Sequence, residues 1–135
     1  MDALRLPRTI ANEILTQAST HPDTEVCGLL GGVGDTVRSC LPVPNVSPDA
    51  HCRYVMDPAG QIDALRNMRN AGDDLVAIYH SHPEGLATPS VTDIREANYP
   101  DAVYLIVSLG IRGVLEMAAF RIDGAGVHDV LLELI

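Results

Sequence analysis

Short apolar segments separated by glycine and proline limit the folds that are open to this chain. The longest apolar runs, such as Ala102–Val107, are about six residues long, which is the length of a buried strand. A membrane-spanning helix needs about 20 apolar residues, so we expect no membrane span. The chain has 135 residues, enough to bury roughly 65–70% of its unfolded surface in one core. We therefore expect a single globular domain over residues 1–135.

Two segments carry apolar residues at helical spacing. In the first, Leu6-Pro7 opens the predicted helix, since proline suits a first helical turn, and His21-Pro22 ends it. The second helix is expected to begin at Asp57-Pro58 and to end at Gly72. Its predicted inward residues are Ile62, Leu65 and Met68.

The remaining apolar segments are predicted to be strands. They are Val26–Gly31, Thr36–Leu41, Tyr54–Met56, Leu75–His80, Ala102–Ser108, Val114–Arg121 and Val127–Leu134. Turns are expected at 33–35, 110–113 and 124–126, and loops at 42–48 and 82–89. A short helix is expected from its cap Ser90 to about Asn98. This order indicates an α/β or α+β domain with a mixed sheet flanked by helices.

The charge of the chain excludes two classes of partner. Eighteen acidic residues face nine basic ones, and all nine are arginine, so the net charge is −9. Binding to nucleic acid requires a basic face that neutralises phosphates, and anionic membrane surfaces require the same. We therefore expect neither partner. The acidic excess fits a salt-rich habitat or simple solubility.

The cysteines and the N-terminus bear on the compartment. Cys27, Cys40 and Cys52 are an odd number and form no CxxC pair, which argues against a zinc ribbon or a thioredoxin-type site. We expect buried free thiols in a reducing cytoplasm. No basic segment followed by an apolar stretch opens the chain, so no signal peptide is predicted.

The sequence 79–93, YHSHPEGLATPSVTD, carries the densest chemistry. His80 and His82 lie two apart at the end of a predicted strand, where alternate side chains share a face. Two such imidazoles can converge on one zinc ion, and Asp93 can add an oxygen ligand from the next helix. Two histidines and one carboxylate leave a fourth position open, which is what a catalytic zinc needs.

Each of these residues also has a structural interpretation. Paired histidines in a loop are often ordinary surface residues, and Ser90 with Asp93 is typical of a helix cap. Capping and ligation are compatible here, because the cap would orient Asp93. A glutamate just before a buried strand, as Glu25 is, usually lies at a solvated strand end. The isolated histidines, which we expect not to be ligands, are His21, His51 and His128.

Taken together, these positions resemble the signature of the JAMM (MPN-plus) metalloproteases. That signature is a glutamate, a long gap, His-Ser/Thr-His, seven residues, then Ser-x-x-Asp, and every position is filled here. The neighbouring sequences Glu25–Gly32, Pro44-Asn45 and Tyr54–Pro58 also resemble the family. The resemblance covers nearly the whole chain and implies a layered fold like that of cytidine deaminases.

The resemblance also implies a role for each motif residue. His80, His82 and Asp93 would hold one Zn²⁺ per chain, with a water as the fourth ligand. Glu25 would be the general base that takes the water's proton and later passes one to the leaving amine. Ser90 would donate a hydrogen bond to the oxyanion. Ser81, on the opposite strand face, is expected to be structural.

The resemblance implies a substrate class as well. Short connections at 51–53 and 98–101 leave no room for the insertions that grip ubiquitin chains in eukaryotic members. The chain therefore resembles the compact prokaryotic branch, some members of which process ubiquitin-like sulfur-carrier proteins after a terminal Gly-Gly. The alternatives are a metal-dependent hydrolase of small amides or peptides and a non-catalytic MPN interaction module. A zinc deaminase needs HxE together with PCxxC, and this combination is absent.

Overall fold

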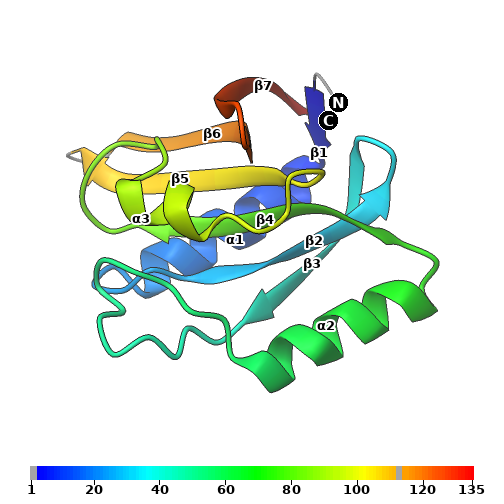
Figure 1. The fold of residues 1–135 in the computed structure, drawn as a ribbon, viewed down its shortest axis with the longest axis horizontal. Helices are drawn as coiled ribbons and strands as arrows, with labels where there is room; N and C mark the ends of the chain where they lie inside the picture. The colour runs from blue at the N-terminus through cyan, green and yellow to red at the C-terminus, as the bar shows by residue number, and fades with distance from the viewer. Residues whose placement is uncertain (1–2, 112–113) are drawn as a thin grey trace.

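The structure is a computed structural model that describes residues 3–111 and 114–135. Its strands form one sheet that closes on itself in the order β1-β3-β2-β4-β5-β6-β7. Figure 1 shows the long strands β2, β4 and β5 crossing the molecule side by side, with the two termini close together at one end. The strands are β1 Ala3–Leu6, β2 Cys27–Val33, β3 Thr36–Val43, β4 Asp74–His82, β5 Val103–Ile111, β6 Val114–Asp123 and β7 Gly126–Leu134.

The sheet is mixed, as the sequence predicts. The β2–β3 and β6–β7 hairpins are antiparallel, and β4 also runs antiparallel to β2. The neighbours β4 and β5 are parallel, because the chain returns through a long connection that contains a short helix. Strand β1 closes the sheet by pairing in parallel with both β3 and β7.

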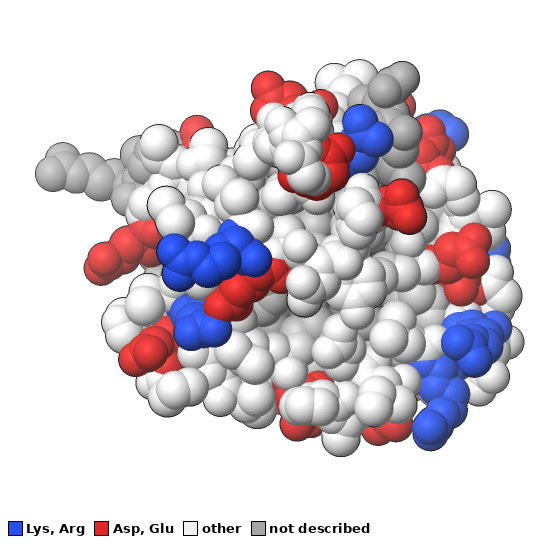
Figure 2. Space-filling model, viewed as in Figure 1, with Lys and Arg blue, Asp and Glu red and all other residues white. Residues whose placement is uncertain are grey.

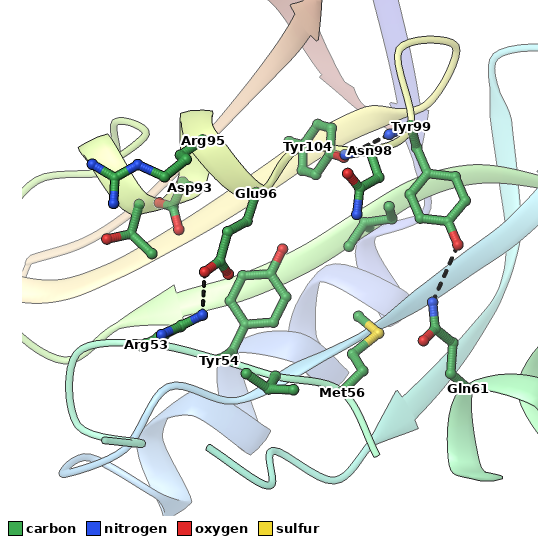
Figure 3. A pocket seen from close by; sticks show the side chains of 13 residues that line it. Arg53, Tyr54, Met56, Gln61, Asp93, Arg95, Glu96, Asn98, Tyr99 and Tyr104 are labelled. Carbon is green, nitrogen blue, oxygen red and sulfur yellow. Dashed lines mark hydrogen bonds and ion pairs between the residues drawn. The ribbon is translucent and has the colours of Figure 1, made fainter. Parts of the chain in front are cut away.

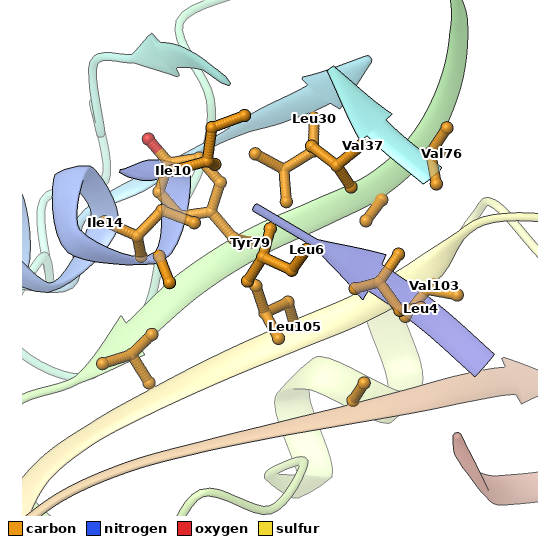
Figure 4. Close-up of a cluster of buried hydrophobic side chains, with 14 of the residues drawn as sticks. Leu4, Leu6, Ile10, Ile14, Leu30, Val37, Val76, Tyr79, Val103 and Leu105 are labelled. Atoms are coloured by element: carbon orange, nitrogen blue, oxygen red, sulfur yellow. The ribbon is translucent and has the colours of Figure 1, made fainter. Parts of the chain in front are cut away.

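The helices α1 (Arg8–Thr20) and α2 (Pro58–Asn70) cover opposite faces of the sheet. Consecutive residues of β4 show this, since successive strand side chains point to opposite faces. Tyr79 packs in the core with Ile14 of α1, whereas Ile78 packs with Met68 of α2. Figure 4 shows the first of these clusters, with α1 and β1 against the sheet. The third helix, α3 (Val91–Glu96), buries no residue and lies beside the end of β4.

Several predicted boundaries need correction. Strand β1 was not predicted, and β3 continues through Pro42 into the segment expected to be a loop. Tyr54–Met56 makes only a single bridge, between Asn45 and Met56, instead of a strand. The loop expected from His82 begins one residue later, because His82 is the last residue of β4.

Two further predictions, the inward position of Ile62 and the end of the third helix, are wrong, and a third falls partly outside the described residues. Ile62 is 56% exposed rather than inward, because the buried stripe of α2 runs through Ala64 and Met68. Helix α3 ends at Glu96 instead of near Asn98. The turn expected at 110–113 falls partly on residues 112 and 113, which lie outside the described residues. None of the helices in residues 3–111 and 114–135 has the length and hydropathy of a membrane span.

Candidate metal centre

Glu25 lies next to the end of β4 because two hydrogen bonds join the adjoining backbones. The Ser81 amide donates to the Val26 carbonyl oxygen at 3.0 Å, and the Val26 amide donates to Ser81 Oγ at 2.9 Å. Ser81 is fully buried on the face opposite the two histidines. These two bonds extend the β2–β4 pairing one residue beyond the Cys27–His80 pair. Glu25, the residue before Val26, therefore lies beside His80 and His82.

A second polar residue organises the loop on the other side of Glu25. The Asn45 amide donates to the carbonyl oxygens of Glu25 and Arg53, at 2.9 and 3.0 Å. Its side-chain oxygen accepts from the Ser47 and Val55 amides, each at 3.0 Å. The family resemblance marks Pro44-Asn45 but not what Asn45 does, because the partners of its side chain depend on the fold.

The side chains of His80, His82 and Asp93 converge on one point. The distance between the two histidine Nε2 atoms is 3.2 Å, and each lies 3.1 Å from Asp93 Oδ2. In a tetrahedral zinc site with bonds of about 2.0–2.1 Å, neighbouring ligand atoms are about 3.3 Å apart. The three atoms thus form a triangle of the size that a zinc ion requires. A carboxylate oxygen of Glu25 completes a cluster whose ligand atoms all lie within 4.8 Å of one another.

The cap of α3 orients Asp93. The Asp93 amide donates to Ser90 Oγ at 3.0 Å, and the Ser90 amide donates to Asp93 Oδ2 at 2.9 Å. This reciprocal pair is a capping box, the arrangement that Ser-x-x-Asp predicts. The oxygen that completes the box is also the one that faces both histidines. Capping therefore holds the carboxylate in the orientation that a ligand needs.

Neighbouring groups orient the two histidine rings. His82 Nδ1 lies 2.8 Å from the Leu86 carbonyl oxygen, which directs the Nε2 lone pair toward Asp93. The Tyr54 ring stacks on the His80 ring with centroids 4.5 Å apart and planes 27° apart. Sequence reasoning placed Tyr54 in a family-like segment but missed its contact with His80, because only the fold brings residues 54 and 80 together.

Burial shapes the electrostatics of the cluster. It raises the pKa of Glu25 to about 7 and lowers the pKa of His80. Burial also opposes ionisation of Asp93, but hydrogen bonds with His80 and His82 hold the pKa of Asp93 well below its usual range. Glu25 Oε1 and His80 Nδ1 are buried without a hydrogen-bond partner among the described residues. The cluster therefore gathers two imidazole nitrogens, the Asp93 carboxylate and the unpartnered oxygen of Glu25, an environment that favours a cation.

Two cavities flank the cluster. One, of about 460 Å³, is lined by Asp93 and by residues of the 53–56 segment, α2 and α3 (Figure 3). The other, of about 390 Å³, is lined by Glu25, His82 and Ser90. The cluster therefore lies between two open spaces, one on the Asp93 side and the other on the Glu25 side.

Of the histidines expected not to be ligands, His21 contacts the Gln17 carbonyl oxygen and His128 contacts Asp123. His51 lines the cavity on the Glu25 side. The expectation of buried thiols is correct only for Cys27, because Cys40 is half-buried and Cys52 is exposed. Cys52 lies outside the core because it belongs to a surface turn that borders the same cavity.

Comparison with known proteins identifies the family. A profile of the family described as prokaryotic homologs of the JAB domain matches residues 7–123. The chain belongs to this family. The resemblance to compact prokaryotic JAMM proteins, inferred from the Glu, His-Ser-His and Ser-x-x-Asp positions, is confirmed.

Three relatives of this JAB-domain chain are peptidases or deconjugating enzymes by name. It is 44% identical over 93 residues to the desampylase of Haloferax volcanii, covering 67% of each chain. It is 35% identical to a probable TtuB-protein conjugate cleaving protease of Thermus thermophilus, over 83% of this chain and 75% of the relative. It is 37% identical to the CysO-cysteine peptidase of Mycobacterium tuberculosis, over 78% of this chain and 73% of the relative.

Solved structures agree with the JAB-domain fold. A solution structure from Desulfitobacterium hafniense matches with a TM-score of 0.87 and 33% identity, covering 98% of this chain and 92% of that one. A JAB1/MPN domain protein from Archaeoglobus fulgidus matches over the full length of both chains, with a TM-score of 0.66 and 18% identity. The predicted mixed α+β class is therefore confirmed.

Proposed function

We propose that this JAB-domain protein is a zinc-dependent peptidase or isopeptidase that cleaves after the C-terminal Gly-Gly of a ubiquitin-like or sulfur-carrier protein. The names of three relatives support the substrate class, because each describes cleavage of a conjugate or processing of such a carrier. The observation that carries the chemistry is the triangle of His80, His82 and Asp93 with the Glu25 carboxylate beside it.

His80, His82 and Asp93 are the proposed zinc ligands, at one ion per chain. Their three facing atoms match the ligand spacing of zinc, and imidazole nitrogens with one carboxylate form a typical catalytic ligand set. A bound zinc ion would supply a Lewis acid and a water that is acidic near neutral pH. The Tyr54 ring and the Leu86 carbonyl oxygen hold the two imidazoles in place.

Glu25 is the proposed general base. Its carboxylate lines the cavity next to the three ligands and has one oxygen without a hydrogen-bond partner among the described residues. The raised pKa of about 7, caused by burial, suits a group that takes a proton from water and returns it near neutral pH. In the hydrolysis, the elements of water add across the bond. Hydroxide adds to the carbonyl carbon, and the proton held by Glu25 goes to the leaving nitrogen as the C–N bond breaks.

Ser90 is the proposed donor to the carbonyl oxygen of the substrate. Ser90 Oγ accepts a hydrogen bond from the Asp93 amide, which leaves its hydroxyl proton available to the cavity that Ser90 lines. A donor at the oxygen that gains negative charge commonly contributes about 3–4 kcal/mol to catalysis. Ser90 therefore both caps α3 and faces the reacting group.

The position of the cluster between two cavities is expected to favour a Gly-Gly tail. The 53–56 segment and α3 border the cluster on the Asp93 side, and the Arg53–Glu96 ion pair joins them (Figure 3). An extended tail without side chains fits between them, and glycine permits close approach of the backbone to the reacting groups. We also propose that the enzyme works in the cytoplasm and that residues 1–135 are one catalytic domain.

The decisive test compares two folded ubiquitin-like carriers by mass spectrometry. One ends in Gly-Gly-Xaa and the other in Ala-Val-Xaa, and Xaa carries a C-terminal amide in both. We expect zinc-dependent release of Xaa from the first and little from the second. Equal rates, or no cleavage of either carrier alongside ready hydrolysis of small amides, would favour a general amide hydrolase. A protein without any hydrolytic activity in the presence of zinc would instead be an interaction module.

A further inference from the structure

The two cavities beside the cluster differ in charge. Arg53 and Arg95 both line the cavity on the Asp93 side, where they offset the carboxylates of Asp93 and Glu96. The cavity on the Glu25 side is lined by the carboxylates of Glu25 and Glu84, and no arginine of the described residues lines it. The chain contains no lysine. The space-filling view shows blue and red side chains mixed near α3, and a second blue group at the lower right over α2 (Figure 2).

The position of Glu25 decides which cavity receives the leaving group. Under the proposed function, Glu25 returns a proton to the leaving nitrogen, so that nitrogen must lie within reach of its carboxylate. Glu25 lines the 390 Å³ cavity and not the 460 Å³ one. It also lines a cavity of about 240 Å³, but neither the two ligand histidines nor Ser90 or Asp93 border that space. Its Oε1 atom is buried, without a partner among the described residues, and the side chain is 5% exposed. The 390 Å³ cavity is thus the leaving-group side, and the carrier tail lies on the Asp93 side.

The acidic leaving-group side distinguishes between two kinds of conjugate. When a carrier is joined to a single amino acid, the leaving group has a free α-carboxylate two bonds from the leaving nitrogen. When it is joined to a lysine side chain or to a continuing polypeptide, no such charge is close. A carboxylate placed near Glu84 is repelled, and no arginine of the described lining residues offsets it. Glu25 adds no charge at this stage, because it holds the proton that goes to the leaving nitrogen.

We propose that this chain discriminates against leaving groups with a free α-carboxylate and prefers conjugates to an amine of a protein, with Glu84 setting the preference. The inference rests on the proposed function. Glu84 is an exposed residue of the β4–α3 loop that holds no ligand, so it acts by charge at the leaving-group side. The mycobacterial relative is named a CysO-cysteine peptidase. A carrier joined to a single cysteine is therefore expected to be a poor substrate for this chain.

The test uses one folded ubiquitin-like carrier ending in Gly-Gly-Ala, prepared with a free C-terminal carboxylate or as the C-terminal amide. The zinc-loaded enzyme should cleave the amide with a kcat/KM about five- to tenfold higher, the size expected for one like-charge contact in a partly solvated site. Glu84→Gln should reduce this preference to about twofold, mainly by faster cleavage of the carboxylate form. Intrinsic differences between the two substrates cancel when the preference is compared between enzymes.

Two controls make the result decisive. Glu13→Gln, an equivalent change on the exposed side of α1, should leave the preference unchanged. Raising the salt concentration should weaken the preference of the unaltered enzyme, because screening reduces charge repulsion at a solvent-exposed group. A preference that neither Glu84→Gln nor salt changes overturns the inference and leaves the proposed function standing. If neither carrier is cleaved, the proposed function itself fails.

Discussion

Ser81 and Val26 exchange two hydrogen bonds, through the Ser81 amide and the Ser81 hydroxyl, and this pair holds Glu25 beside the two histidines. Ser81→Ala should lower the free energy of unfolding by about 1–3 kcal/mol, because the buried Val26 amide loses its acceptor. Urea unfolding measures the change. Ser19→Ala, an exposed change on α1, is the matched control and should have little effect. Equal stability of the Ser81 and Ser19 variants would mean that the hydroxyl is not needed there.

The proposed ligand set predicts the metal content. The purified protein should hold about one zinc per chain by elemental analysis, and a chelator should abolish activity that added zinc restores. His80→Ala and Asp93→Ala should each lose the ion, because two remaining ligands bind zinc weakly. His128→Ala should keep it, since His128 contacts Asp123 away from the cluster. Full zinc occupancy in both ligand variants would contradict the assignment.

The assignment of Glu25 as general base predicts a separation of binding from turnover. Glu25→Gln should keep the fold and the zinc, because the glutamine amide is nearly isosteric with the carboxylate. The amide cannot accept a proton from water, so turnover should fall. The expected loss in kcat is about 10²–10⁴-fold, the usual contribution of a general base. Steady-state kinetics beside elemental analysis checks both parts. Near-normal turnover would remove Glu25 from this role.

The fold was largely predictable from local patterns, and its errors have physical causes. Buried strands such as β5 are apolar runs that periodicity detects. Strand β1 is only four residues long and pairs with β7 across almost the entire chain, so no local signal marks it. In α2, the predicted inward position is right for Met68 and wrong for Ile62, where Ala64 is buried instead, because more than one stripe of residues obeys helical spacing.

The candidate site was predictable where spacing along the chain determines proximity. The His-Ser-His spacing places two imidazoles on one face of β4, and Ser-x-x-Asp predicts the cap that orients Asp93. Residues that contribute through tertiary contacts, such as Tyr54 and Asn45, had no such signal. The assigned roles and the single-domain extent of residues 1–135 stay predictions.

The three cysteines should differ in reactivity. Burial raises the pKa of Cys27 to about 12 and that of Cys40 to about 11, so few thiolates form at either position near pH 8. Cys52 is exposed and should react first. Brief treatment with iodoacetamide followed by peptide mass spectrometry measures the order. Cys52→Ser should remove the fast phase of labelling, and a fast phase that persists in this variant would assign it to another cysteine.

The burial of Glu25 also predicts how the stability of the metal-free protein depends on pH. Burial raises the pKa of Glu25 from 4.5 to about 7. Between pH 4.5 and about 7, the folded state therefore keeps a proton on Glu25 that the unfolded state has released. Stability from this group is therefore fully present below about pH 4.5 and is lost as the pH rises through about 7. The loss is about 3 kcal/mol at most, at about 1.4 kcal/mol per pKa unit.

Glu25→Gln isolates this effect, because glutamine stays neutral at every pH. In urea unfolding of the chelated proteins, the variant and the unaltered chain should have similar stability at pH 4.5, and the variant should be the more stable at pH 8 to 9. Glu13→Gln, which removes an exposed carboxylate, should show no comparable rise. A difference between Glu25→Gln and the unaltered chain that does not grow with pH would mean that the Glu25 carboxylate ionises in the folded protein as easily as in the unfolded one.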